Sequence, residues 1–148
     1  MIDIEIEGDA WTAQPEAVAL TRNAAEAVLA YERLSDRNLT VLLTTDLAVQ
    51  ALNARFRGQD KPTNVLSFPA APNPESHLGD IALAYETCAR EAAEQKKPMA
   101  DHLQHLVAHG VLHLLGYDHM SDPEAEEMEA IERTVLAKLG VPDPYEHG

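Results

Sequence analysis

The stretch from residue 102 to residue 119 reads HLQHLVAHGVLHLLGYDH and is the most informative segment of the chain. Apolar residues recur through it at helical spacing, and Pro98 just upstream suits the first turn of a helix. Gly116 then permits a sharp turn. The sequence therefore predicts a helix from about residue 98 to about Leu115, followed by a reversal of the chain.

Strands and helices alternate upstream of this helix, and helices dominate after it. Residues 2–7 alternate isoleucine with acids, the period-two pattern of a half-buried strand, and Thr12 is a candidate N-cap for the helix that follows. Strands are expected at residues 2–7, 38–44, 64–68 and 78–84, and helices at about residues 13–31, 46–57, 85–97, 98–115 and 122–139.

These elements predict one α+β domain over residues 1–148, with a small mixed sheet covered by about five helices. A chain of 148 residues buries roughly 70% of its unfolded surface, so it needs no disulfide. The single cysteine, Cys88, excludes an internal disulfide and is expected to be a buried apolar residue of a helix. We expect the metal site described below to lie on residues 98–115 and the turn after them.

Charge and hydropathy narrow the possible functions. The N-terminus is acidic, unlike a signal peptide, and no run approaches the ~18 apolar residues that cross a bilayer. We therefore expect a soluble cytoplasmic protein without a membrane partner. The formal charge of −14 should repel a polyanion, so a nucleic-acid enzyme of this composition needs a locally positive surface. Arg55, Arg57 and Lys61 lie within seven positions and are the candidates, with Arg90 and residues 96–97 as a possible extension.

Five of the seven histidines lie in residues 102–119. His109 and His113 are four residues apart, so their rings project from one helical face, and the turn at Gly116 brings His119 toward them. Three imidazoles suit one zinc ion per chain and leave a fourth position for water, as in catalytic rather than structural zinc sites. Zinc lowers the pKa of such a water to about 7, whereas magnesium and calcium prefer oxygen ligands.

The ligand spacing H-x-x-x-H-x-x-G-x-x-H is also that of metzincin proteases, but those enzymes carry a glutamate base directly after the first histidine. Gly110 stands at this position and weakens the peptidase interpretation. His102 and His105 could be extra ligands, partners of the ligands, or polar groups at the mouth of the site. Asp118 could fix a ligand's tautomer or only satisfy the turn.

Two further alternatives stay open at this point. If His105 were a fourth ligand, the shell would be closed and the chain could be a non-catalytic zinc protein. A site too narrow for a nucleic-acid strand would instead favour a hydrolase of small phosphoesters.

Several short motifs follow one another along the chain. They are Leu52-Asn53, Arg57-Gly58, KPTNVLSFP at residues 61–69, LGDI at residues 78–81, HGVLHLLGYDH at residues 109–119, and the acidic helix ending near Asp143-Pro144-Tyr145. In kind and order they resemble the YbeY family of bacterial zinc-dependent endoribonucleases, which act in ribosomal RNA maturation and ribosome quality control, and HGVLHLLGYDH is the most specific of them. The resemblance thus runs from about residue 46 to Tyr145.

The resemblance implies a four-stranded sheet, zinc held by His109, His113 and His119, and a catalytic role for Arg57. It implies a substrate of single-stranded ribosomal RNA and its precursors, notably at the 3′ end of the small-subunit RNA, and the ribosome or its associated proteins as partners. With a closed shell, the same resemblance would imply a non-catalytic, ribosome-associated zinc protein. The chemistry of Arg57 agrees, because a guanidinium fork matches two phosphate oxygens and stays charged at any physiological pH.

Overall fold

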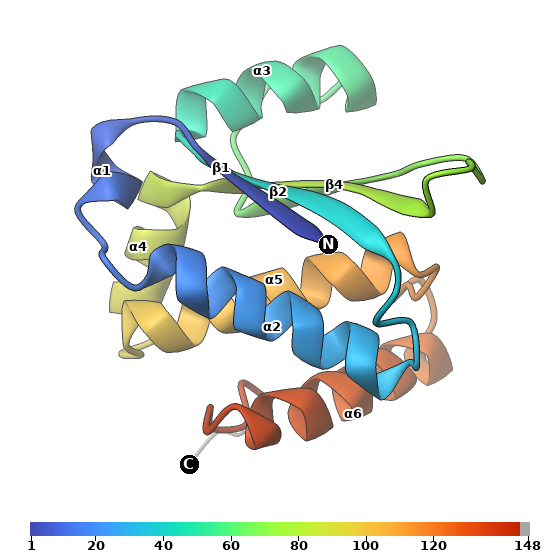
Figure 1. Cartoon of the computed structure of the whole chain (residues 1–148). Helices are drawn as coiled ribbons and strands as arrows, with labels where there is room; N and C mark the ends of the chain where they lie inside the picture. Colours follow the sequence, from blue (N-terminus) through green and yellow to red (C-terminus); the bar gives the residue numbers. More distant parts are fainter. Residues whose placement is uncertain (146–148) are drawn as a thin grey trace.

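A four-stranded mixed sheet forms the centre of the protein, seen in a computed structural model that describes residues 1–145 (Figure 1). The strands are β1 (Ile2–Ile6), β2 (Asn38–Thr44), β3 (Val65–Pro69) and β4 (His77–Ala84). They lie in the order β1-β2-β4-β3. β1, β2 and β4 are parallel, and β3 pairs antiparallel with β4, with Ser67 opposite Ile81. The predicted α+β class and mixed sheet are confirmed, and β3 lies at one edge.

Helices cover both faces of the sheet, but unequally (Figure 1). α3 lies alone on one face, while α2, α4 and α5 lie on the other, and α6 packs outside α2 and α5. In the described part of the chain the helices are α1 (Asp9–Thr12), α2 (Ala17–Tyr31), α3 (Asp46–Arg57), α4 (Tyr85–Glu94), α5 (Met99–Leu114) and α6 (Asp122–Lys138). None of these helices is long and apolar enough to cross a bilayer.

The segment between β1 and α2 differs from the prediction. Thr12 is the last residue of the short helix α1 and does not cap α2, which begins after Glu16. The physical reason is Trp11, whose side chain is 1% exposed and donates a hydrogen bond from Nε1 to the backbone oxygen of Thr44 (2.8 Å). Burial of this ring against the sheet fixes a separate helical turn that local propensity does not predict.

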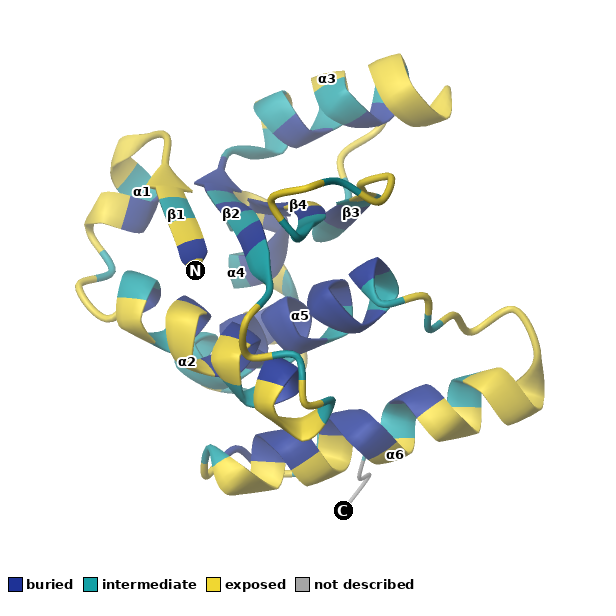
Figure 2. Ribbon diagram, turned by 45° about the vertical axis from the view of Figure 1, so that its right-hand side comes forward, coloured by how far each residue is buried: buried dark blue, intermediate teal, exposed yellow. Residues whose placement is uncertain are grey.

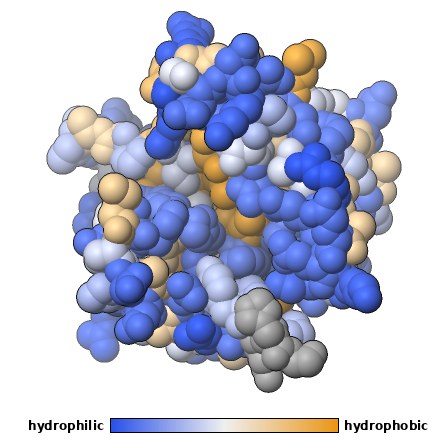
Figure 3. Space-filling model, turned by 180° about the vertical axis from the view of Figure 1, so that it is seen from behind, coloured by the Kyte–Doolittle hydropathy of each residue, from blue (hydrophilic) through white to orange (hydrophobic). Residues whose placement is uncertain are grey.

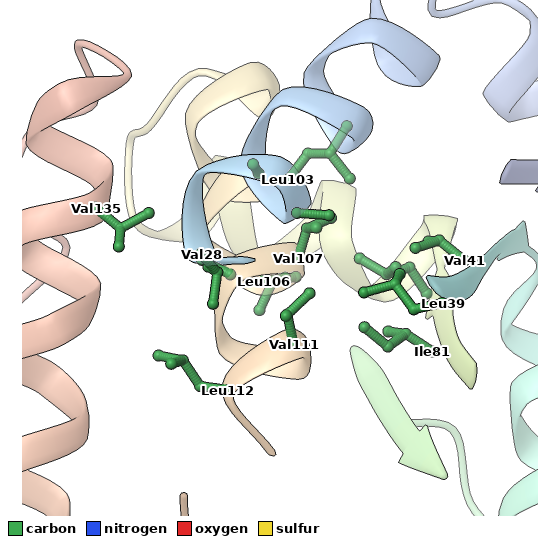
Figure 4. Close-up of a cluster of buried hydrophobic side chains, with 14 of the residues drawn as sticks. Val28, Leu39, Val41, Ile81, Leu103, Leu106, Val107, Val111, Leu112 and Val135 are labelled. Carbon is green, nitrogen blue, oxygen red and sulfur yellow. The ribbon is translucent and has the colours of Figure 1, made fainter. Parts of the chain in front are cut away.

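The helix predicted from residues 98–115 is the centre of the main core. α5 is the most thoroughly buried of the longer helices, with its apolar side chains between α2, α6 and the sheet (Figure 2). In the core view, Val107 and Val111 of α5 lie near Val28 of α2 and the sheet residues Val41 and Ile81 (Figure 4). Cys88 of α4 is fully buried, as predicted. The smaller core under α3 contains Val49, Leu66, Ala82 and Ala84.

Gly110 allows α5 to approach the sheet closely. A Cβ atom at this position would lie 3.0 Å from Cγ2 of Ile81 and 3.3 Å from Oγ of Ser67, which is closer than side-chain atoms normally pack. The Ser67 hydroxyl donates to the backbone oxygen of Gly110 across the same contact (3.0 Å). The C-terminal half of α5 is therefore held beside the edge strand β3.

Candidate metal centre and its cleft

The end of α5 and the turn after it bring together the three histidines singled out in the sequence. His109 and His113 lie one helical turn apart, and their Nε2 atoms are 3.0 Å from each other. Gly116 then takes a φ of 99°, a conformation that side chains disfavour, and the chain reverses. His119 follows in this turn, so that one ligand nitrogen from each histidine lies within 4.8 Å of the others.

This arrangement fits a tetrahedral metal ion. Zinc–nitrogen bonds of about 2.0–2.1 Å place two tetrahedral ligand nitrogens roughly 3.3 Å apart, close to the observed separation of His109 and His113. Burial, reinforced by the neighbouring His109 and His119, lowers the pKa of His113, which favours the neutral imidazole that binds metal. Within residues 1–145, this is the one cluster of at least three histidine, cysteine or acidic side chains close enough to share an ion.

A buried carboxylate that the sequence analysis did not single out supports this cluster. Glu132 of α6 is 0% exposed and accepts hydrogen bonds from Nδ1 of His109 (2.7 Å), from Nε2 of His105 (3.1 Å) and from the Tyr145 hydroxyl. Burial alone would raise the pKa of Glu132, but the hydrogen bonds from His105 and His109 outweigh it and lower the pKa to about 2. The carboxylate is thus ionised.

The contact with Glu132 determines how His109 faces the site. A carboxylate only accepts hydrogen bonds, so His109 carries its proton on Nδ1 and directs the lone pair of Nε2 toward His113. The sequence did contain a signal for Glu132: it interrupts an otherwise apolar buried stripe on α6. The neighbours in that stripe are Met128, Ile131, Val135 and Leu136.

The other polar residues near the site each have an identified hydrogen-bond partner. His105 directs Nε2 to Glu132, so this nitrogen supports the carboxylate and the interpretation as a fourth ligand is not favoured. His102 is 3% exposed and pairs with the Glu91 carboxylate (2.9 Å) rather than with the site. Asp118 accepts a hydrogen bond from the backbone N–H of His119 (2.7 Å), as expected for a residue that satisfies the turn.

A cleft of about 740 Å³ opens beside the histidines and along the edge strand β3. Arg57, from the last turn of α3, lines the same cleft and donates a hydrogen bond from Nη2 to the backbone oxygen of Ser67. The walls of the cleft come from β3 and the loop before it, from α5, and from the turn after α5. The lining residues are Arg57, Thr63, Asn64, Val65, Leu66, Ser67, Pro69, His109, His113, Gly116, Tyr117, Asp118, His119 and Met120. Seen from behind, the protein surface is mostly hydrophilic, with a hydrophobic strip near its centre (Figure 3).

The predicted positive surface is only partly assembled at the cleft. Arg57 lines it, whereas Arg55 and Lys61 are exposed outside it. Neither Arg55 nor Arg57 forms a salt bridge with any acid in residues 1–145, so their charges are free for a ligand. Arg90 pairs with Glu94 (3.8 Å) and does not line the cleft, so it does not extend this surface.

Gly110 also bears on the peptidase alternative. A glutamate here would place its Cβ 3.0 Å from Ile81 and 3.3 Å from Ser67, so it would not fit unless α5 or the sheet moved. Because glycine has no side chain, no carboxylate on α5 occupies the position of the protease base.

Comparisons with known proteins agree with this geometry. The family model described as endoribonuclease YbeY matches residues 3–140. A protein named endoribonuclease YbeY from Rhodopseudomonas palustris (strain BisB18) is 53% identical, covering 97% of this chain and 90% of its own length. The one from Paramagnetospirillum magneticum is 51% identical, with 97% and 94% covered. The solution structure of TM1509 from Thermotoga maritima superimposes with a TM-score of 0.62 at 28% identity, over 99% of this chain and all of that one.

Proposed function

The chain belongs to the endoribonuclease YbeY family, and from this premise we propose that it is a hydrolase that cuts phosphodiester bonds within RNA in the cleft between its histidine cluster and Arg57. One observation supports this most: three converging imidazoles and an arginine without an acidic partner line the same open cleft. Phosphodiester cleavage needs positive charge around the reacting phosphate, which Arg57 carries itself and which the three imidazoles would supply by holding a metal ion.

We propose that His109, His113 and His119 hold one zinc ion per chain. A zinc ion bound there would supply Lewis-acid chemistry, polarising a phosphoryl oxygen or lowering the pKa of a water. The donor set supports this choice, since it consists of nitrogen atoms and their spacing suits a tetrahedral shell. Glu132 keeps the proton of His109 on Nδ1 and so leaves Nε2 free for the ion.

Arg57 is the proposed catalytic residue for the phosphate. A guanidinium has five N–H donors, and the hydrogen bond to Ser67 uses one of them while fixing the group at the edge of β3. The remaining donors can bind two phosphate oxygens and stabilise the negative charge that grows as the bond breaks. Because the cleft is open, it admits a strand and not only a small phosphoester.

The natural substrate and setting follow from the family. We propose that residues 1–148 act as one domain on single-stranded ribosomal RNA precursors, notably at the 3′ end of the small-subunit RNA, in maturation and quality control. The ribosome or its associated proteins would be the partners, and the cytoplasm the location. An acidic chain that carries the unpaired Arg57 in the cleft agrees with binding RNA locally, because the acidic remainder of the surface repels RNA.

A matched pair of arginine variants tests the function. Zinc-loaded wild type should cleave a ribosomal RNA precursor and leave an unstructured protein intact. Arg57→Ala should keep its zinc and lose cleavage, whereas Arg22→Ala, which removes the same charge from an exposed position on α2, should behave as wild type. Cleavage of the protein and not of the RNA would refute the proposal in favour of a peptidase. Product ends identify the nucleophile, since a 2′,3′-cyclic phosphate requires attack by the RNA 2′-hydroxyl.

A further inference from the structure

The only two phenylalanines of the chain lie against each other where α3 ends beside β3. The rings of Phe56 and Phe68 have centroids 5.6 Å apart and are inclined at 64°. Phe68 is partly buried and packs on the small core under α3, but Phe56 is 59% exposed. Most of the Phe56 ring is therefore exposed to solvent, while the partly buried Phe68 holds it in place.

Two arginines accompany the rings. The guanidinium of Arg55 lies 5.2 Å from the centroid of Phe56, and that of Arg57 lies 5.6 Å from the centroid of Phe68. Since neither arginine has a salt-bridge partner in residues 1–145, positive charge and aromatic surface alternate without neutralisation. We call Arg55, Phe56, Arg57 and Phe68 the α3 platform.

The α3 platform begins where the cleft ends. Side chains alternate along β3, so Ser67 faces α5 while Phe68 faces α3. Arg57 crosses the edge between the two sides: it lines the cleft, donates to the backbone of Ser67, and lies over Phe68. A strand whose phosphate is bound by Arg57 in the cleft would pass over this edge and meet Phe56 next.

We propose that the α3 platform binds a nucleobase of single-stranded RNA next to the phosphate held in the cleft, by stacking on Phe56, while Arg55 binds the adjoining backbone phosphate. The inference rests on the proposed function and adds a subsite to it. Exposed aromatic rings interleaved with unpaired arginines are the chemistry by which proteins hold single strands, because every base has a face to stack and every linkage a charge. A paired strand offers no free base face, so this subsite selects against duplexes.

The test uses zinc-loaded protein and a single-stranded RNA oligonucleotide containing 2-aminopurine, whose fluorescence falls on stacking. Stopped-flow mixing gives the dissociation constant before cleavage, and steady-state cleavage gives kcat and KM. Phe56→Ala should weaken binding at least about fivefold, raise KM by a similar factor and lose the quenching, since stacking on an aromatic ring contributes this much or more. Phe56→Tyr, which keeps a ring, should restore binding to within about twofold.

Leu47→Ala is the matched control, because Leu47 is a large apolar side chain of the same helix, 77% exposed, at the end away from β3. It should leave binding and cleavage unchanged. The same oligonucleotide annealed to its complement should show no difference between wild type and Phe56→Ala. Equal single-strand affinity of wild type and Phe56→Ala, or a defect that Phe56→Tyr does not restore, would overturn the platform. Wild-type protein that neither binds nor cuts the single strand would instead overturn the proposed function itself.

Discussion

Replacing Glu132 with glutamine should weaken zinc binding about five- to tenfold while leaving the fold in place. Glu132 is fully buried, and its carboxylate accepts the Nδ1 proton of His109 over 2.7 Å. Glutamine has the same shape but carries no charge, and it has one acceptor oxygen where the carboxylate has two. If the amide oxygen keeps the bond from His109, the amide nitrogen takes the place of the second oxygen and faces both His105 and Tyr145, which donate to that oxygen in the wild type.

The magnitude follows from the change in hydrogen bonding. Bonds to a charged group contribute about 1.5–3 kcal/mol and neutral ones about 0.5–1.5 kcal/mol, so His109 loses roughly 1 kcal/mol or slightly more of support. At 1.4 kcal/mol per tenfold change, this corresponds to the stated factor in the zinc dissociation constant.

Glu132→Ala removes the support entirely and should weaken zinc binding by about 10- to 100-fold. It also leaves buried donors unpaired, so it should unfold at a lower temperature than the glutamine variant.

Competition with a chromophoric chelator measures the zinc dissociation constant, and the absorption of the cobalt-substituted protein reports the coordination geometry. Glu126→Gln is the matched control, since it makes the same change on the same helix at an exposed position. Circular dichroism on heating shows whether each variant is folded. If Glu132→Gln binds zinc as tightly as Glu126→Gln does, Glu132 does not position His109 and the assigned tautomer is wrong.

Three further outcomes are expected. Arg57→Ala should reduce kcat/KM for RNA at least about 100-fold with zinc content unchanged, because it removes a charged group from the reacting phosphate; metal analysis beside a cleavage assay checks this. Gly110→Glu should lower the free energy of unfolding in urea by at least about 3 kcal/mol, since its Cβ would lie 3.0 Å from Ile81 and its carboxylate would be buried; a smaller loss would show that α5 can shift. Chelation should lower the melting temperature of wild type but not of His113→Ala, because an ion at 100 times its dissociation constant stabilises the folded state by about 2.7 kcal/mol; equal shifts in calorimetry would place the metal elsewhere.

The features that the sequence predicted well are those set by local spacing. The strand and helix pattern follows from periods of 2 and 3.6, and the approach of His109 to His113 follows from one turn of a helix. Gly116 and the three residues after it were enough to predict that His119 would return to the same place. These relations involve neighbours in the chain, so no knowledge of tertiary packing is needed.

The features that the sequence did not predict depend on contacts between distant segments. Thr12 fails as a cap because Trp11 is buried against β2, 33 residues away. Glu132 joins the site only because α6 packs on α5, and one charge within an apolar stripe does not reveal its partner. The resemblance implied a catalytic role for Arg57, but the hydrogen bond that holds it to the backbone of Ser67 depends on how α3 crosses the sheet.

The most direct test of a zinc-dependent RNA-cutting site at His109, His113 and His119 compares wild type with His113→Ala on a ribosomal RNA precursor, with zinc measured in both proteins. We predict that wild type holds one zinc ion per chain and cleaves the RNA. His113→Ala should remain folded, lose the zinc and leave the RNA intact. A folded, zinc-free His113→Ala protein that cleaves at the wild-type rate would contradict the account.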